Sequence, residues 1–257
     1  MGSGLNMLVP GASVEGGTGW VTAQRLASMG GHVTVGARRL ERAAILADEI
    51  GGTAVACDAT MENQVEAIVA EAVRVGQGDL DVAVLAAGEG VSGTIDGIGD
   101  AEFERCMALN YTAAVYFVRH VTRRMKPGGG IVLMSSIAAT NPWPGYFAYG
   151  CAKAALQTLV KYAALEYAER PIRINAVCPG PVATVPGAPE MPQAVSDVID
   201  GAMPLRRRVT PAEVADAVAW LACGATATTG DMVHLDGGMH LGRPSYPAEI
   251  KAALQGV

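Results

Sequence analysis

The sequence predicts an α/β fold in which about seven parallel strands form one doubly wound sheet with helices on both faces. Three observations support this prediction. Short apolar runs alternate with helical patterns, the first run ends in a glycine-rich turn, and half of the residues are apolar while only 17% are charged. Alternating strands and helices form parallel sheets, and strands buried on both faces read as apolar runs. We therefore expect a single domain over residues 1–257.

The first half of the chain predicts four strands and three helices. We expect strands over 5–9, 32–37, 53–57 and 82–87, separated by helices over 18–29, 40–50 and 62–75. The strand over 32–37 is rich in β-branched residues. The helix over 18–29 carries apolar residues at Val21, Leu26 and Met29.

The second half continues the alternation. We expect helices over 101–125, 148–168 and 211–222, and strands over 131–135, 172–177 and 232–235. Lys126-Pro127-Gly128 is a stop signal for the first of these helices. Thr210 as N-cap, Pro211 at N1 and Glu213 at N3 predict the start of the last helix. The Pro- and Gly-rich stretch over 179–192 predicts a mobile loop.

Charge and hydropathy exclude several classes of partner. The net charge of -6 gives no general attraction to nucleic acid or to an anionic membrane. No stretch of 18 or more apolar residues occurs, so we expect no membrane-spanning helix. Residues 1–10 lack the basic start and apolar core of a secretory signal.

The five cysteines predict reduced thiols in a cytoplasmic protein. They are spread widely, and no pair has a spacing typical of a metal site. An odd number of cysteines without a secretory signal favours a reducing compartment. We expect most of them to be buried apolar side chains and expect no metal. Cys151 stands out because it lies between Tyr149 and Lys153.

A glycine-rich turn over 11–19 joins the first predicted strand to the first helix. Glycines there allow backbone N–H groups to approach a pyrophosphate at a helix N-terminus. The second strand then ends in Ala37-Arg38-Arg39, without the acidic residue that would bind a free ribose 2′-hydroxyl. Arginines there favour a 2′-phosphate. We therefore expect NADP(H) to be preferred, with NAD(H) as the second option; alternatively, the two arginines only solvate a helix start.

Several motifs in chain order resemble the short-chain dehydrogenase/reductase family along nearly the whole sequence. They are the glycine turn, Asp58, Ala86-Ala87-Gly88, Asn110, Ser135-Ser136, Tyr149-x-x-x-Lys153, Asn175 to Gly180 and Asp236-Gly237-Gly238. The resemblance implies a Rossmann-like fold and a catalytic set of Ser136, Tyr149, Lys153 and Asn110. It also implies cofactor contacts from Gly11, Ser13, Gly17, Gly19, Arg38, Arg39, Asp58, Ala59, Ala87, Gly88, Tyr149, Lys153, Pro179, Gly180, Val182 and Thr184. Asp58 would accept from the adenine amino group, or would serve only as an N-cap.

Physical chemistry supports the implied catalytic roles. Tyr149 and Lys153 are an i, i+4 pair on one helix face. We expect the lysine cation to lower the tyrosine pKa, so that Tyr149 exchanges a proton with a carbonyl or alcohol oxygen. Ser136, at the carboxyl end of the fifth strand, would bind the same oxygen. Lys153 would also hold the ribose hydroxyls, and Asn110 would seat a proton-relaying water.

The sequence departs from the family pattern around the cofactor. Pro10 precedes the first glycine, Gly17 and Gly19 arrive two residues late, and Ala86 stands where the family has Asn. The longer turn resembles the enoyl-reductase branch, whose tyrosine lies seven residues before the lysine, where this chain has Tyr146. The retained Ser136 favours carbonyl chemistry. A cofactor-binding regulatory module without turnover is the third alternative.

The predicted substrate is a medium-sized, apolar, uncharged ketone or secondary alcohol. Trp143 and Tyr146, together with Ser136 and Tyr149, are the predicted substrate-binding residues, although the aromatic side chains could equally be packing. The stretch over 185–203 resembles an apolar lid. By resemblance we expect a homo-oligomer, tetramer or dimer, formed through the helices over 101–125 and 148–168. The tail over 240–257 would reach a neighbour or fold over its own pocket.

Overall fold

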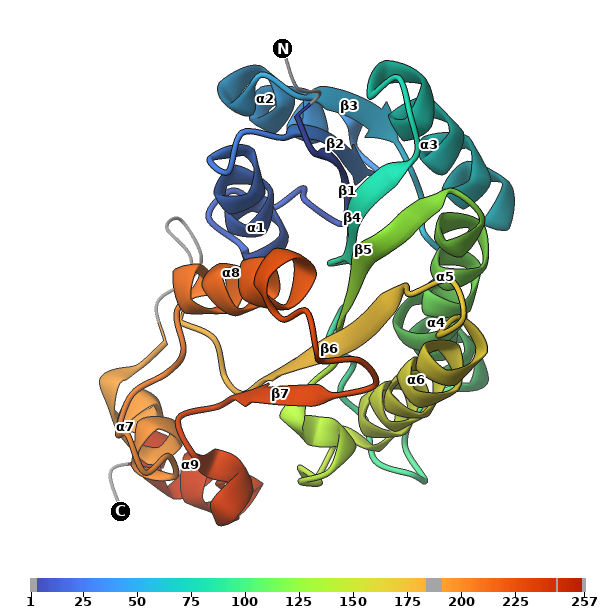
Figure 1. Ribbon diagram of the computed structural model, residues 1–257. Helices are drawn as coiled ribbons and strands as arrows, with labels where there is room; N and C mark the ends of the chain where they lie inside the picture. The colour runs from blue at the N-terminus through green and yellow to red at the C-terminus, as the bar shows by residue number, and fades with distance from the viewer. Residues whose placement is uncertain (1–3, 184–190, 244, 256–257) are drawn as a thin grey trace.

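The computed structural model describes residues 4–183, 191–243 and 245–255. Its centre is one parallel sheet in the order β3-β2-β1-β4-β5-β6-β7, flanked by helices (Figure 1). The strands are β1 Asn6–Pro10, β2 His32–Ala37, β3 Thr53–Ala56, β4 Leu80–Leu85, β5 Met125–Met134, β6 Arg173–Pro179 and β7 Met232–Leu235. The strand order reverses between β1 and β4, which is where open α/β sheets bind ligands at their carboxyl ends. The predicted fold class is confirmed.

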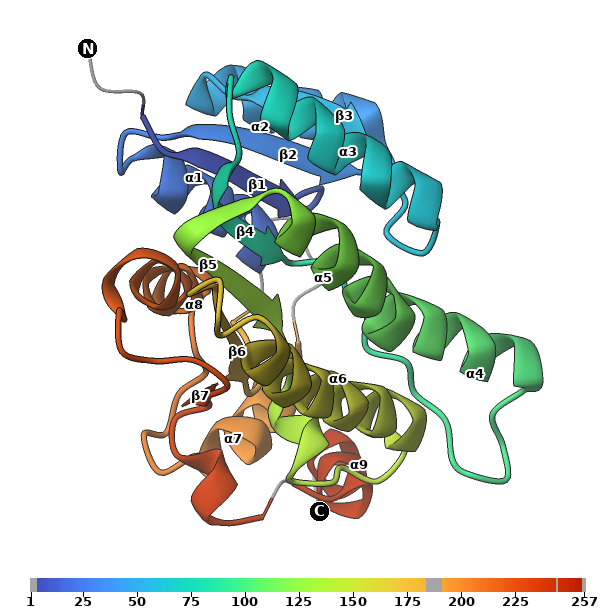
Figure 2. The same cartoon turned by 45° about the vertical axis from the view of Figure 1, so that its right-hand side comes forward.

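Helices cover both faces of the sheet (Figure 2). They are α1 Thr18–Ala27, α2 Leu40–Ile50, α3 Glu62–Val75, α4 Asp100–Met107, α5 Ala113–Arg123, α6 Phe147–Glu166, α7 Gln193–Gly201, α8 Pro211–Ala219 and α9 Pro247–Gln255. Buried residues of α1, α2 and α8 share one core cluster with one face of the sheet. Those of α3, α5 and α6 form a second cluster on the other face.

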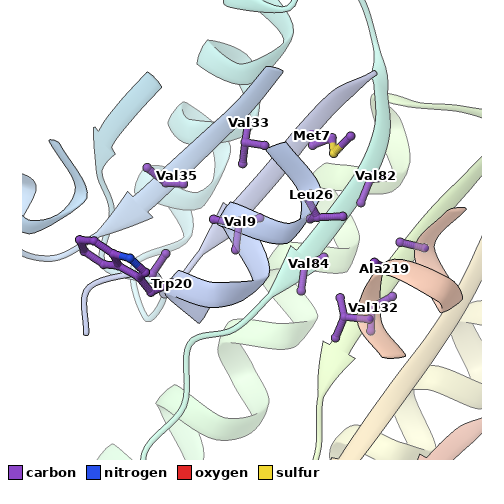
Figure 3. Close-up of a cluster of buried hydrophobic side chains, with 14 of the residues drawn as sticks. Met7, Val9, Trp20, Leu26, Val33, Val35, Val82, Val84, Val132 and Ala219 are labelled. Atoms are coloured by element: carbon purple, nitrogen blue, oxygen red, sulfur yellow. The ribbon is translucent and has the colours of Figure 1, made fainter. Parts of the chain in front are cut away.

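Alternation along β1 decides which face each side chain serves. Met7 and Val9 lie in the first cluster, and Leu8 between them lies in the second. Figure 3 shows Met7 and Val9 beside Trp20 and Leu26 of α1. Successive side chains of a strand point to opposite faces, so a strand between two helical layers must be apolar throughout.

The predicted helix over 101–125 is confirmed over residues 100–123, with a π-turn inside it and an end two residues earlier than predicted. It consists of α4, a π-turn over Ala108–Thr112, and α5, which ends at Arg123. The stop signal over 126–128 follows the end of the helix, and its residues belong to the start of β5. Met125 pairs with Leu80, and the register then shifts before Gly130 pairs with Val82. The glycines permit this irregular strand because Gly128 has a φ of 84°.

The segment that was predicted as a lid contains helix α7. Its Val195 and Ile199 pack with Met203, Ile137 and Met239 in a small third core. Within the stretch over 179–192 that predicts a mobile loop, Val182 forms a β-bridge with Val209. Residues 184–190 of this stretch lie outside the described residues.

The C-terminal tail folds over its own chain. Helix α9 contacts α7, and Ser245 Oγ donates to the Val198 carbonyl at 3.0 Å. Over the described ranges, no helix is both long and apolar enough to cross a bilayer. In the same part of the chain, no three His, Cys, Asp or Glu side chains gather where they could hold a metal ion.

The predicted start of α8 is present as a full capping box. Thr210 Oγ1 accepts from the Glu213 N–H at 3.2 Å, and Glu213 Oε2 accepts from the Thr210 N–H at 2.8 Å. These bonds satisfy backbone donors that the first helical turn leaves unpaired.

We expect Thr210→Ala to lower the free energy of unfolding by about 1 kcal/mol, because an N-cap hydroxyl is lost. Thr226→Ala, at an exposed position with no side-chain cap, should stay within about 0.5 kcal/mol. Denaturant unfolding monitored by circular dichroism measures both. Equal effects of the two substitutions would contradict the capping role.

Candidate active site

A cavity of about 290 Å³ lies at the carboxyl ends of β1, β2, β3 and β4. Of the predicted cofactor residues, it is lined by Gly11, Ser13, Arg38, Arg39, Asp58, Ala59, Ala87 and Gly88. Sequence reasoning missed Val14, Ala37, Cys57, Glu89 and Leu109, and did not count Ala86 as a contact. Most of these are chain neighbours of predicted positions at strand ends. Leu109 has no such signal except its place beside Asn110.

Glycine at position 11 lets two turns touch. Its φ is 96°, and a Cβ there would lie 2.2 Å from the Ala87 backbone nitrogen. A Cβ on Gly19 would lie 2.4 Å from the Gly11 carbonyl oxygen. Gly17 is the N-cap of α1. Neither Gly17 nor Gly19 lines the cavity, so their late arrival lengthens the turn while Gly11 keeps its close contact with the turn after β4.

Two exposed arginines face the cavity from the end of β2. Arg38 and Arg39 line it, and neither forms an ion pair or a side-chain hydrogen bond with any residue that the structure describes. Asp58 lies on the same cavity, where its Oδ1 accepts from the Thr60 hydroxyl at 2.7 Å. The alternative N-cap role of Asp58 is wrong, because α3 begins at Glu62 and Met61 is its N-cap.

The four predicted catalytic residues come from three elements at this edge of the sheet. Ser136 follows β5, Tyr149 and Lys153 lie on α6, and Asn110 lies in the π-turn. The Lys153 Nζ atom is 5.6 Å from the centre of the Tyr149 ring. It donates to the Met134 carbonyl at 2.8 Å.

Gly88 provides the open surface next to these groups. A Cβ at this position would lie 3.1 Å from Lys153 Nζ and 3.2 Å from Asn110 Oδ1. Gly88 also lines the cavity. Because glycine has no side chain, position 88 leaves the amine of Lys153 and the amide of Asn110 open to the cavity.

The prediction that the Tyr149 pKa is lowered is wrong. Burial raises the pKa of Tyr149 above its usual value, and the Ser136 hydroxyl opposes that rise by hydrogen bonding. Burial also lowers the pKa of Lys153 to about 8. Both charged forms are disfavoured by loss of water, and the sequence carries no signal of that loss.

Asn110 fixes the loop after β4. Its Nδ2 donates to the Glu89 carbonyl at 3.0 Å and to the Cys106 carbonyl at 3.1 Å, and its Oδ1 accepts from the Glu89 N–H at 3.2 Å. The π-turn points this side chain at the loop, because the turn accommodates an extra residue. The Asn110 amide is therefore bonded to backbone groups, whereas the family resemblance implied that it would hold a proton-relaying water.

A buried polar network behind the site was missed. Gln157 Nε2 donates to Ser135 Oγ at 3.2 Å and contacts Cys178 Sγ at 3.3 Å. Ser135 Oγ lies 3.5 Å from the Lys153 carbonyl. The available signal is a polar residue one helical turn after Lys153 on the buried face of α6. The network ties α6 to β5 and β6.

The remaining predicted residues lie outside the first cavity. Pro179 ends β6, Gly180 N–H donates to the Leu235 carbonyl at 2.9 Å, and Val182 pairs with Val209. Thr184 lies outside the described residues. Trp143 and Tyr146 line a second cavity of about 720 Å³ on the outer side of α6.

Comparison with known proteins identifies relatives over nearly the whole chain. A family model described as enoyl-(acyl carrier protein) reductase matches residues 11–240. Glucose 1-dehydrogenase of Gluconobacter oxydans is 34% identical over 254 residues, covering 93% of each chain. The 1-cyclohexenylcarbonyl-CoA reductase of Streptomyces collinus is 32% identical over 263 residues, covering 96% of this chain and 91% of that protein. A short-chain dehydrogenase/reductase structure from Serratia marcescens superimposes with a TM-score of 0.84 at 28% identity, covering 93% and 98%.

The buried ammonium of Lys153 makes stability depend on pH. Because its pKa falls from 10.5 to about 8 on folding, the folded chain binds this proton less tightly than the unfolded chain. The cost of the charge is therefore complete below pH 8 and declines as pH rises from 8 to 10.5. We expect Lys153→Met to be more stable than the unaltered chain at about pH 7, by on the order of 2 kcal/mol, and the difference to shrink at about pH 9.5.

Denaturant unfolding at both pH values measures this difference. Lys161→Met, at an exposed position of the same helix, is the matched control and should show no such dependence. A Lys153→Met difference that stays constant with pH would show that burial does not strain the lysine charge.

Proposed function

Because the chain belongs to the short-chain dehydrogenase/reductase family, we propose that it reduces a ketone or oxidises a secondary alcohol with Tyr149 as general acid/base. The family makes the chain an oxidoreductase that uses a nicotinamide cofactor. The observation that carries the proposal is that the Ser136 hydroxyl interacts with Tyr149, and that Lys153 lies beside both the Tyr149 ring and Gly88. These residues lie at the edge where the strand order reverses.

The residues present fit a dinucleotide. The bare Gly11 turn, the bare Gly88 surface and the two unpaired arginines all border one cavity. When bound, the nicotinamide supplies or accepts the hydride. Lys153, which reaches the edge of that cavity through Gly88, would hold the ribose hydroxyls.

The protein's own groups handle the proton. In reduction, the Tyr149 hydroxyl donates its proton to the carbonyl oxygen, and in oxidation the phenolate removes it. Because burial raises its pKa, Tyr149 is protonated before the proton transfer. Ser136 binds the same oxygen, and its Oγ is held by the Ala138 N–H at 3.1 Å. The Lys153 cation stabilises the phenolate that forms.

The preference for NADP(H) over NAD(H) rests on Arg38 and Arg39. Both side chains are exposed at the cavity and have no anionic partner among the described residues. No acidic residue stands at the end of β2 to bind a free 2′-hydroxyl. A 2′-phosphate would supply the missing anion, with charge-assisted hydrogen bonds.

Enoyl-thioester reduction by Tyr146 is the second candidate. The description of the matched family model and the name of the Streptomyces collinus relative favour it. Tyr146 is 38% exposed and lines the second cavity. The retained Ser136 beside Tyr149 favours carbonyl chemistry.

The proposal places the enzyme in the cytoplasm as a homo-oligomer. The five cysteines carry free thiols in the structure, as a reducing compartment would keep them. The outer face of α6 exposes Tyr162 and Leu165, and partner helices could cover these side chains in a dimer or tetramer.

Turnover tests the reaction and the residue that carries it. Consumption of NADPH and NADH is measured with a panel of ketones and one enoyl thioester. We expect ketone-dependent turnover that Tyr149→Phe lowers by about 10²- to 10⁴-fold without loss of NADPH binding, because the proton donor is removed. Tyr146→Phe should reduce that turnover far less.

Two other outcomes would favour the alternative functions. Turnover with the enoyl thioester alone, abolished by Tyr146→Phe, would transfer the chemistry to Tyr146. NADPH binding without turnover on any substrate would favour a regulatory module, which has no activity for Tyr149→Phe to remove.

Cofactor affinity tests the arginines separately. We expect the double variant Arg38→Ala/Arg39→Ala to raise the NADPH dissociation constant by about 100-fold, because each charge-assisted contact contributes about 1.5 kcal/mol or more. The NADH constant should change by less than about twofold. Arg42→Ala, exposed on α2 outside the cavity, is the control for net charge. An equal loss of affinity for both cofactors would contradict the 2′-phosphate role.

A further inference from the structure

Glu89 places a carboxylate on the wall of the first cavity, the one of about 290 Å³ at the carboxyl ends of β1 to β4. It directly follows Gly88, and its side chain is 49% exposed. The charged side chains among the described residues that line this cavity are Arg38, Arg39, Asp58 and Glu89. The proposed contact with a 2′-phosphate uses the two arginines, and it leaves Glu89 without a role.

The strand order places Glu89 at the end of the first cavity that borders the reaction centre. Arg38 follows β2, whereas Glu89 lies in the loop after β4. The sheet runs in the order β3-β2-β1-β4-β5, and Ser136 lies just after β5. A Cβ on Gly88 would lie 3.1 Å from the ammonium nitrogen of Lys153. A dinucleotide whose 2′-phosphate meets the arginines therefore has its nicotinamide half at the end where Glu89 lies.

The charge of Glu89 is only partly compensated. Its backbone is held by Asn110, whose Oδ1 accepts from the Glu89 N–H at 3.2 Å and whose Nδ2 donates to the Glu89 carbonyl at 3.0 Å. Its carboxylate accepts from the Arg105 guanidinium at 2.9 Å. That guanidinium also lies 3.8 Å from the carboxylate of Glu102. Because two carboxylates share one cation, a net negative charge remains beside the cavity.

The two forms of a nicotinamide cofactor differ in the charge of the ring. The oxidised ring is a cation and the reduced ring is neutral, so a nearby carboxylate stabilises the oxidised form relative to the reduced form. The ammonium of Lys153 acts in the opposite direction. Glu89 is the one carboxylate on this side of the cavity among the described residues that line it. Its charge therefore offsets the effect of Lys153 on the bound ring.

We propose that Glu89 is a specificity-determining residue that favours the oxidised cofactor over the reduced cofactor, and that Arg105 weakens this preference. The inference rests on the proposed function, because it needs a nicotinamide at this end of the cavity. Tighter binding of the oxidised form shifts the equilibrium between the two bound forms toward it by the same factor. On the enzyme, transfer of the cofactor hydride and the Tyr149 proton to a ketone, which yields an alcohol and the oxidised cofactor, becomes more favourable.

The test compares the dissociation constants of NADPH and NADP⁺ for the full chain. Titration of NADPH fluorescence gives the first constant, and displacement of NADPH by NADP⁺ gives the second. The measured quantity is the NADPH constant divided by the NADP⁺ constant. We expect Glu89→Gln to lower this quotient about threefold, a modest factor because water surrounds the exposed carboxylate. Arg105→Gln should raise the quotient by about the same factor, because the cation that opposes Glu89 is lost.

Glu102→Gln is the matched control. It removes the same charge beside the same arginine, but Glu102 does not line the cavity. The quotient should therefore stay within about 1.5-fold of its original value. An ion pair that only held the loop after β4 would make Glu89→Gln and Arg105→Gln change the quotient in the same direction or leave it unchanged. Either result would overturn the proposal.

The same measurement with NADH and NAD⁺ should give the same changes, because the charge of the ring is the same in both cofactor pairs. If the quotient changes in opposite directions in the Glu89→Gln and Arg105→Gln variants but the chain reduces no ketone, the inference stands and the proposed reaction fails. If ketones are reduced and neither substitution changes the quotient, the reaction stands and the inference is overturned. If the unaltered chain binds neither cofactor pair, both are overturned.

Discussion

The structure around the site depends on a buried cation that has no anion beside it. Lys153 is 2% exposed, its ammonium donates to the Met134 carbonyl, and in the described parts of the chain it forms no ion pair. A charge in such a place is tolerated only where dipoles surround it in fixed positions. The carboxyl end of β5 supplies one such dipole. The neighbouring segments must therefore hold their shape.

Two neighbouring features meet that requirement. Gln157 links α6 to the strand ends through Ser135 and Cys178, so the helix that carries Lys153 and Tyr149 cannot rotate freely. Asn110 clamps the loop after β4 through the Glu89 backbone. The buried charge of Lys153 thus lowers stability locally, and the hydrogen bonds of Gln157 and Asn110 around it raise stability. This pattern is typical of sites that trade stability for activity.

The parts of the fold with a local signal could be predicted from the sequence. The helices over 40–50 and 62–75 and the strands over 32–37 and 232–235 have the predicted bounds, because periodicity and flanking glycines mark them. Helices α7 and α9 were not predicted, because they are short and pack mainly against each other. The site motifs predicted Gly11, Arg38 and Gly88 as cofactor contacts, and all three line one cavity. The raised Tyr149 pKa and the Gln157 network depend on burial and on contacts between distant segments, which a single sequence does not display.

The π-turn over Ala108–Thr112 has a consequence for how this site can vary. An α-helix turns through about 100° per residue, so one residue more or less in this stretch redirects everything that follows it. Asn110 reaches the Glu89 backbone because the helix accommodates one surplus residue. The orientation of the Asn110 amide therefore depends on the number of residues in the π-turn as well as on its hydrogen-bond partners. A chain that kept Asn110 but lost one residue from the π-turn would aim this asparagine away from the loop that borders the cofactor cavity.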